Sequence, residues 1–599
     1  MSLITVDEVH DLDVLIIGAG GAGIRAAIAA SSEGVATGLV CKSLFGKAHT
    51  VMAEGGIAAS MGNVYPEDNW RVHFRDTMRG GKMLNNWRMA QLHAQEAPDR
   101  VMELEEWGAL FDRTPDGRIL QRDFGGHRFA RLAHVGDRTG LELIRTLQNK
   151  ATSLGVKVFM ECTILRLLTD GPRVVGALGY WRESGSFVIF RAKATVLATG
   201  GVGKAYKVTS NSWEYTGDGH VLALLAGADL IDMEFLQFHP TGMVWPPSVR
   251  GLLVTEGVRG DGGVLRNSDG KRFMFDYVPE MFRSETADTE EEADRWYTDK
   301  KGARRTPDLL PRDEVARAIN SEIKAGRGSP HGGVFLDIAS RRDPEYIKRR
   351  LPSMYHQFKQ LAGVDITSEP MEIGPTCHYM MGGVRVDPDT GASTLPGLYA
   401  AGEVAGGMHG SNRLGGNSLS DLLVFGRRAG LGAAAAAAAE RTTPTFDPAQ
   451  VDAIAREALS VFDAKTRLSP YEVHRKLQDC MQSLVGIVRT GDELTEALQR
   501  LEGIQQEAHE VSVEGNLQYN PGWHLAMDLH SMTMVSRCIT MAATARKESR
   551  GGHTRNDFPG PDPELGKVNM VVRYRDAELT VTPEPLPVMP DDLAELFKS

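Results

Sequence analysis

The 599-residue sequence predicts an α/β protein of several domains, because different local patterns occur in separate parts of the chain. Short apolar runs lead into glycine-rich turns near residues 13–23, 194–203 and 394–407. Residues 444–545 instead place apolar side chains at spacings of three and four, which is typical of amphipathic helices. A single hydrophobic core stops growing at roughly 250 to 300 residues, so more than one domain is expected.

The first of these segments predicts a strand, a glycine turn and a helix. Residues 13–17 (DVLII) are too few for a helix, and alanine-rich residues 24–30 follow the turn. Such a turn lets backbone N–H groups approach a pyrophosphate, and the helix N-terminus adds a favourable dipole. G-x-G-x-x-G is a weak signal alone, but its place between a predicted strand and helix favours dinucleotide binding. The glycines are Gly18, Gly20, Gly21 and Gly23.

The second predicted strand, residues 36–41, ends without an acidic residue. A nicotinamide-binding domain usually has an acid about 20 residues after the glycine turn, where it binds a ribose 2′-hydroxyl. This chain has Lys42 and Ser43 there. The pattern disfavours a nicotinamide cofactor and favours FAD, with Lys42 and Ser43 among its contacts.

The loop at residues 42–57 is predicted to hold a flavin. It places His49 and Thr50 ahead of two glycines, Gly55 and Gly56. A histidine in a loop is more often an ordinary surface or hydrogen-bonding residue. Its position after the second strand of a dinucleotide fold is what favours a role at the flavin.

The two later strand-to-glycine segments, ATVLATGGVG and TLPGLYAAGEVAGG, could each be a plain strand end. Together with the first turn, they predict a two-dinucleotide-fold flavoprotein whose FAD domain is discontinuous. Glu403, in the third segment, is predicted to accept hydrogen bonds from a ribose. Asp218, in Thr-Gly-Asp-Gly, is a second candidate near the flavin.

The intervening segment, roughly residues 234–366, is predicted to be an inserted domain. QFHPTG at 237–242 and TEGVRGDGG at 255–263 place histidine, hydroxyl, acid and arginine side chains in glycine-rich loops, and Pro-Arg-Asp follows at 311–313. Residues 285–305 form a mixed charge run, for which a solvated loop or helix face is the simplest interpretation.

A helix start is predicted within residues 411–420 (SNRLGGNSLS), ahead of the apolar residues 422–439. Hydroxyl and N–H groups at a helix start suit anionic or carbonyl acceptors. Asn417, Ser418 and Leu419 are therefore assigned to the cofactor site.

These patterns predict a Rossmann-like two-dinucleotide-binding FAD domain that an α+β capping domain interrupts, followed by a helical bundle and a small C-terminal domain. In the last segment, residues 568–573 and 578–581 alternate like two strands. The expected bounds are 1–235 and 366–435 for the FAD domain, 236–365 for the capping domain, 436–545 for the helical domain and 546–599 for the C-terminal domain.

Composition narrows the functional classes. The formal net charge of −11 favours solubility and argues against a nucleic-acid-binding surface. Five scattered cysteines lack Cys-x-x-Cys spacing, so reduced thiols and no metal site are expected. The first ten residues do not resemble a signal peptide, and no uninterrupted apolar stretch reaches the approximately 20 residues needed to cross a bilayer.

Along nearly its whole length, the sequence resembles the flavoprotein subunit of succinate dehydrogenase and fumarate reductase. The motifs that carry the resemblance are residues 18–23, 48–50, 237–242, 255–260, 311–313, His378 and residues 412–420. The resemblance implies that His49 bonds covalently to the flavin 8α-methyl group, which is one way in which a protein tunes its cofactor. L-aspartate oxidase, a close relative, lacks this histidine and binds FAD non-covalently.

The resemblance also implies how succinate or fumarate is held. His239 and Thr255 match the residues that grip one carboxylate, and His378 and Arg413 match those that grip the other. Arginine supplies bidentate, charge-assisted hydrogen bonds that fix a dianion. Hydride transfer to FAD would then oxidise succinate to fumarate.

Arg312 matches the family's proton-transfer residue, with Glu256 and Arg259 as its relay. An arginine acting as acid or base conflicts with its pKa above about 12. The hypothesis is that neighbouring cations and Glu256 make a transient neutral guanidine accessible. A structural ion pair is the alternative for Arg312.

Electrons that reach FAD need an exit, because the chain has no cluster-binding cysteines. The resemblance implies an iron–sulfur subunit docked near the flavin, membrane-anchor subunits beneath it and quinone as the final acceptor. The chain would then lie at the cytoplasmic face of the inner (cell) membrane, peripherally, through its partners.

Two positions depart from the commonest family pattern. Ala48 is often serine, and Glu54 stands where many succinate dehydrogenases have glutamine; fumarate-reducing members resemble this chain there. An acid near the flavin is expected to disfavour a reduced anionic ring.

Succinate oxidation with a low-potential quinone is the favoured direction. The alternatives are a quinol-dependent fumarate reductase, a soluble L-aspartate oxidase-like or stand-alone enzyme, and a non-catalytic flavin-binding protein.

Overall fold

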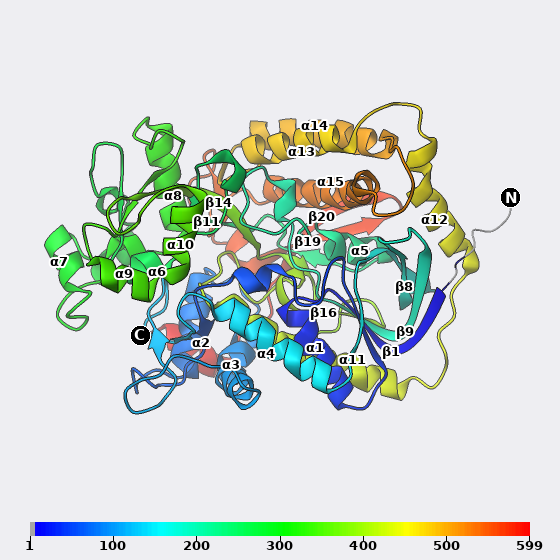
Figure 1. Cartoon of the computed structure of the whole chain (residues 1–599), viewed down its shortest axis with the longest axis horizontal. Coiled ribbons are helices and arrows are strands. Elements are labelled where there is room, and N and C mark those ends of the chain that lie inside the picture. The colour runs from blue at the N-terminus through cyan, green and yellow to red at the C-terminus, as the bar shows by residue number, and fades with distance from the viewer. Residues whose placement is uncertain (1–5, 7, 599) are drawn as a thin grey trace.

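A seven-stranded sheet, whose strands β1, β8 and β9 lie at the right of Figure 1, is the largest sheet of the computed structural model, which describes residue 6 and residues 8–598. Its strand order is β6-β2-β1-β9-β8-β7, and β16 also pairs with β9. Strands β6, β2, β1, β9 and β16 pair in parallel, whereas β9, β8 and β7 form an antiparallel meander. The strands are β1 (Glu8–Ile17), β2 (Thr37–Val40), β6 (Lys157–Phe159), β7 (Cys162–Asp170), β8 (Arg173–Trp181), β9 (Phe187–Leu197) and β16 (Leu398–Ala400).

The two faces of this sheet enter two different cores, because successive side chains of a strand point to opposite faces. Val14 and Ile16 of β1 pack with helices, whereas Leu15 and Ile17 join the core of the antiparallel strands and the C-terminal helices. The helices of the first face are α1 (Gly21–Ser32), α3 (Trp87–Glu106), α4 (Thr139–Ser153) and α11 (Asn417–Ala439).

Helix α11 is long and apolar enough to cross a membrane, with a mean hydropathy of 1.3 over its most apolar window. In this fold, 56% of that window is buried in protein, and the helix packs along α1 and α3. We therefore describe α11 as a core helix of the FAD domain.

The capping domain has its own antiparallel sheet and its own core, and it lies at the left of Figure 1 in green. The sheet order is β11-β14-β13-β12, with β11 (Leu236–Met243), β12 (Val264–Arg266), β13 (Val334–Asp337) and β14 (Met371–Met380). The helices are α6 (Gly257–Gly260), α7 (Glu290–Arg295), α8 (Arg312–Lys324), α9 (Pro344–Arg350) and α10 (Pro352–Leu361).

Strand β14 lies beyond the expected end of the capping domain at residue 365, yet it is the strand that pairs with β11 and β13. The local sequence of residues 371–380 gives no sign of which sheet they join. The charged residues of 285–305 are largely exposed, as expected, but Arg305 donates hydrogen bonds to the carbonyls of Phe124 and His127 in the FAD domain.

Four helices follow, as the spacing of apolar residues predicts, and they lie at the upper right of Figure 1. They are α12 (Pro448–Asp463), α13 (Pro470–Leu484), α14 (Gly491–Glu510) and α15 (Pro521–Ala545). Their apolar faces share one continuous core with β7, β8 and β9. The helical domain is therefore built onto the FAD domain.

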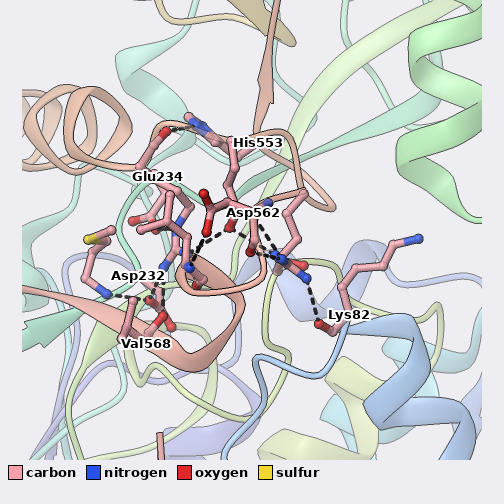
Figure 2. A network of polar contacts seen from close by, with 12 residues as sticks. Lys82, Asp232, Glu234, His553, Asp562 and Val568 are labelled. Atoms are coloured by element: carbon pink, nitrogen blue, oxygen red, sulfur yellow. Dashed lines mark hydrogen bonds and ion pairs between the residues drawn. The ribbon is translucent and has the colours of Figure 1, made fainter. Parts of the chain in front are cut away.

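The C-terminal segment is also joined to the FAD domain. Its hairpin, β19 (Val568–Arg575) and β20 (Glu578–Pro585), continues a sheet with β10 (Leu230–Ile231) and β15 (Gly383–Val384). A buried polar network reinforces this junction (Figure 2). Arg546 is fully buried and pairs with Asp232, Glu234 and Glu548, and Arg550 also pairs with Glu548.

Candidate active site

A deep cavity opens where the carboxyl ends of β1, β2, β9 and β16 meet the capping domain. Ligands of α/β sheets usually bind at this edge. All predicted site residues line the cavity except Gly23, Arg259 and Asn417. The lining members are Gly18, Gly20, Gly21, Lys42, Ser43, His49, Thr50, Gly55, Gly56, Asp218, His239, Thr255, Glu256, Arg312, His378, Glu403, Arg413, Ser418 and Leu419.

The glycine turn lies at one end of this cavity. Gly18 has a φ of +110°, which favours glycine, and α1 begins after Gly20 without a side-chain cap. Apart from the Gly21 N–H, which donates to Thr50 Oγ1, the N–H groups of its first turn are therefore free for an anionic ligand. A Cβ on Gly23 would overlap the carbonyl of Gly18, so Gly23 permits close packing of helix and strand.

Lys42 lies in the same part of the cavity, but its ammonium is held by the protein itself. It pairs with Asp218 at the first turn of α5 (Asp218–Ala226) and with Asp528 of α15. The sequence predicted Lys42 and Asp218 as separate cofactor contacts. No motif marked Asp528, which is 486 residues from Lys42.

His49 lies further along the cavity, at the start of a short 3-10 helix (His49–Met52). Its ring centroid is 5.3 Å from that of Tyr215 and 6.0 Å from that of His378. Thr50 ties this turn to the glycine turn by accepting a hydrogen bond from the Gly21 N–H at 3.3 Å. Burial, reinforced by Arg413, lowers the pKa of His49 to about 4, so a neutral imidazole nucleophile is present at pH 7.

The N-terminus of α11 faces the cavity through Ser418 and Leu419. Asn417 turns away: its side chain bonds His73 Nε2 at 3.0 Å and donates to Thr77 Oγ1 at 3.0 Å. Asn417 therefore supports the helix start from behind and does not line the cavity.

Two histidines face each other on neighbouring strands of the capping sheet. The rings of His239 on β11 and His378 on β14 are 5.1 Å apart. The Val254 carbonyl accepts from His239 Nε2 at 3.0 Å, and Ser210 Oγ contacts His378 Nδ1 at 2.8 Å. Burial and neighbouring cations hold the pKa of both imidazoles well below 6.5, so they are neutral at pH 7.

Glu256 stands between two arginines. Its carboxylate is 2.9 Å from Arg312 Nε and 3.9 Å from Arg259 Nη2, and it accepts from the Gly125 N–H at 2.7 Å. Burial alone would raise the pKa of Glu256, but Arg312 and Arg259 outweigh it and lower that pKa below 4.5. Arg259 lies behind Glu256, where it donates to the Asp308 carbonyl, so only Arg312 and Glu256 face the ligand.

Arg413 approaches the same space from the FAD domain. Its guanidinium lies 4.3 Å from the centre of the Tyr379 ring and donates to Ser418 Oγ at 2.9 Å. Burial, and then Arg312, lowers the pKa of Arg413 to about 9, which still leaves it charged at pH 7. The local potential is therefore positive.

Two guanidinium N–H groups of the cavity-lining arginines have no hydrogen-bond partner within the described part of the chain: Arg312 Nη1 and Arg413 Nε. A buried donor without a partner costs about 1–3 kcal/mol. Donors from the capping domain and the FAD domain thus converge on one cavity. An anion with two acceptor groups would satisfy them.

The same cavity fits FAD. The free N–H groups of α1 suit a pyrophosphate, and the predicted ribose contact, Glu403, accepts from the Met380 N–H at 2.9 Å beside Tyr215. Burial raises the pKa of Glu403 to about 8. A protonated Glu403 could donate as well as accept a hydrogen bond.

Several lining or supporting residues escaped the sequence analysis. Tyr215, Tyr379 and Ser210 were assigned no role from the sequence. Gln237 belonged to a recognised motif but received no role; its amide donates to Asn412 Oδ1 at 2.9 Å and to the Arg413 carbonyl at 2.7 Å, which holds the Arg413 loop against β11.

Comparisons with known proteins agree with this geometry. Residues 13–419 match the model of the FAD binding domain family, and residues 474–591 match that of the fumarate reductase flavoprotein C-terminal region. The chain is 44% identical to a fumarate reductase (CoM/CoB) chain of Methanothermobacter marburgensis, over 93% of this chain and 96% of that one. It is 36% identical to the succinate dehydrogenase flavoprotein subunit of Rickettsia bellii, over 97% of this chain and 98% of that one.

Solved structures extend the likeness to three dimensions. Mycobacterium smegmatis Sdh1 in complex with UQ1 matches with a TM-score of 0.86 and 58% identity, over 99% of this chain and 97% of that one. A mutant of E. coli quinol fumarate reductase FrdA matches with a TM-score of 0.89 and 32% identity, over 97% of this chain and 98% of that one. The chain therefore belongs to the family of succinate dehydrogenase and fumarate reductase flavoprotein subunits, and it is an FAD-dependent oxidoreductase.

Proposed function

We propose that this chain interconverts succinate and fumarate at the seam between its FAD and capping domains and transfers the electrons to a partner subunit. The observation that carries the proposal is the convergence of unpaired donors from Arg312 of the capping domain and Arg413 of the FAD domain beside His49. A dicarboxylate supplies acceptors at both of its ends.

The capping domain supplies ligands for both carboxylates, and the FAD domain adds Arg413. His239 and Thr255 of the capping domain bind one end, and Arg413 with His378 binds the other. The free Nε of Arg413 and its aromatic support on Tyr379 fix the direction in which the guanidinium points. Orienting the substrate in this way lowers the entropy cost of reaching the transition state.

Arg312 exchanges the proton. Its Nη1 has no partner among the described residues, whereas its Nε donates to Glu256, so one end of the guanidinium is anchored and the other is available. When succinate is oxidised, one carbon loses a hydride and the adjacent carbon loses a proton to a transiently neutral Arg312. Glu256, ionised and shared with Arg259, relays that proton away.

The cofactor is FAD, held by the glycine turn, by Lys42, Ser43, Thr50 and Asp218, and by the start of α11. When bound, FAD supplies a two-electron centre that accepts or returns the hydride. The neutral imidazole of His49 is the group that would tether it covalently.

Glu54 requires a correction to the charge argument made from sequence. Burial, reinforced by Asp137, raises the pKa of Glu54 well above 4.5, and its Oε2 has no partner in the described structure. This shift favours the protonated form of Glu54 and so weakens the negative charge that the acid would place beside the ring. We retain succinate oxidation as the proposed physiological direction.

The proposed electron exit is an iron–sulfur subunit, followed by membrane-anchor subunits and quinone, at the cytoplasmic face of the cell membrane. The similar Mycobacterium smegmatis Sdh1 structure contains UQ1, which supports a quinone-linked partner. Isolation of a fully active single chain without a cysteine-rich partner would contradict this part of the proposal.

A denaturing gel and an acceptor assay test the function. Purified from its host, the chain is expected to show flavin fluorescence on the gel, to co-purify with an iron–sulfur polypeptide and to reduce a quinone analogue with succinate. Flavin released by acid, together with turnover of L-aspartate, would indicate the aspartate oxidase alternative. Failure of malonate to slow reduction of the flavin by succinate would contradict the dicarboxylate site.

A further inference from the structure

We propose that Asp528, in the helical domain, is a positioning residue for the adenosine half of FAD, because it fixes Lys42 and Asp218 at the edge of the cavity. This inference rests on the proposed binding of FAD. It gives the helical domain a part in holding the cofactor, although none of the described residues of that domain lines the cavity.

The three charged groups form a compact buried cluster. Lys42 Nζ lies 2.7 Å from Asp528 Oδ1 and 2.9 Å from Thr216 Oγ1, and it also pairs with Asp218. Thr216 Oγ1 donates to Asp218 Oδ1 at 2.8 Å. The side chains of Lys42, Asp218 and Asp528 are only 12%, 14% and 8% exposed.

The position of this cluster identifies the part of FAD that it serves. Lys42 follows Cys41 just after β2, at the strand end where an acid normally binds the adenosine ribose. Here that acid is missing from the sequence, but the structure brings Asp218 to Lys42 from α5. Both residues line the cavity, so the carboxylate can serve the ribose from a different element.

Asp528 is needed because the flexible side chain of Lys42 could contact Asp218 alone in more than one rotamer. A lysine side chain loses up to about 2 kcal/mol of conformational freedom when it is fixed, and a second buried carboxylate helps to hold it in one rotamer. Asp218 and Asp528 raise the pKa of Lys42 against the effect of burial, so the ammonium persists. Without the Asp528 carboxylate, Lys42 and Asp218 still form a balanced ion pair, but Lys42 loses the contact that fixes it from the helical domain.

Asp528→Asn tests the proposal by removing charge while keeping the size of the side chain. The full chain carrying His49→Ser is used as the parent, so that flavin binding is reversible and can be titrated by fluorescence. We expect Asp528→Asn to weaken FAD binding at least tenfold, about 1.4 kcal/mol. Binding of FMN, which lacks the adenosine half, should change less than twofold.

A matched control is available at the same domain boundary. Asp479 on α13 pairs with Lys207 at 2.7 Å, but these side chains are 61% and 60% exposed. Exposed pairs contribute about 0–1 kcal/mol, so Asp479→Asn should leave FAD affinity within twofold of the parent. Asp528→Glu keeps the charge and should recover most of the FAD affinity.

The outcomes separate this proposal from the assignment of FAD. Unchanged FAD affinity in Asp528→Asn, or an equal loss for FAD and FMN, would overturn the role of Asp528 while leaving the proposed function intact. A parent that binds no FAD would overturn the proposed function itself. If Asp528→Asn does not fold, Asp528→Ser is the second variant that removes the carboxylate: a selective loss of FAD affinity in it supports the proposal, and unchanged FAD affinity overturns it.

Discussion

The two ends of the cavity treat charge in opposite ways. At the adenosine end, Lys42 is neutralised by Asp218 and Asp528 within the protein. At the substrate end, Arg413 has no carboxylate partner among the described residues, and Arg312 leaves one nitrogen unpaired. The first arrangement positions a ligand with a preformed, internally satisfied framework, whereas the second depends on the ligand to complete it.

This difference predicts where substitutions should affect chemistry and where they should affect occupancy. Unpaired buried donors are unfavourable until an anion arrives, so the substrate end converts binding energy into orientation. At the adenosine end, the charges of the protein are already paired with one another, so this end gains little from the charge of the ligand. Its contribution is to hold the binding groups in fixed positions. The predictions that follow test this contrast, beginning with the largest expected effect.

Arg312→Lys should lower kcat for succinate oxidation by about 10³-fold, because general acid–base groups contribute about 10²–10⁴-fold. A single ammonium cannot reproduce the two ends of the guanidinium, of which Nε binds Glu256 while Nη1 stays available. Steady-state turnover, with thermal unfolding and flavin content measured in parallel, checks this expectation. Lys324→Arg, on the exposed side of the same helix, is the control and should leave turnover unchanged. Near-normal oxidation by Arg312→Lys would remove Arg312 from proton transfer.

Arg413→Gln should weaken binding of malonate by about 100-fold, since loss of a buried charge-assisted pair costs about 2–5 kcal/mol. Flavin difference spectra provide the dissociation constant. The malonate affinity of Arg413→Lys should lie between those of the wild type and Arg413→Gln, because lysine retains the charge of arginine but not its planar, bidentate guanidinium. Equal affinity in all three proteins would mean that the dianion does not contact this side of the cavity.

His49→Ser should abolish flavin fluorescence on a denaturing gel while FAD still binds reversibly. Loss of the tether is expected to lower the flavin potential, and for a two-electron couple about 30 mV changes the equilibrium tenfold. Succinate oxidation should therefore fall by a larger factor than fumarate reduction. Comparison of the two rates in one preparation checks the prediction, and retained covalent flavin would contradict it.

Glu403 should make the stability of the FAD-free chain depend on pH. Burial raises its pKa from 4.5 to about 8, so the folded chain holds a proton that the unfolded chain releases. The contribution is complete below about pH 4.5 and is lost as pH rises through about 8, with a slope of at most about 1.4 kcal/mol per unit. Urea unfolding of Glu403→Gln should show a smaller loss between pH 5 and 8 than the wild type, and parallel curves would contradict this assignment.

Local sequence determined those features that depend on a few neighbouring residues. The turn at Gly18 to Gly23 and the helices of residues 448–545 follow from glycine conformations and apolar spacing, which are properties of short segments. The motif resemblance also identified both arginines of the substrate end. For this reason, nearly all predicted site residues were found in one cavity.

Contacts between distant segments were decided only by the tertiary structure. Strand β14 joined the capping sheet beyond the predicted boundary, and Asp528 reached Lys42 across 486 residues. The side chain of Asn417 contacts His73, and Arg259 lies behind Glu256. Both lie there because a buried polar side chain is stable only where the packing provides a partner. Sequence thus determined which chemical groups are present, whereas packing decided which of them remain unpaired and face a ligand.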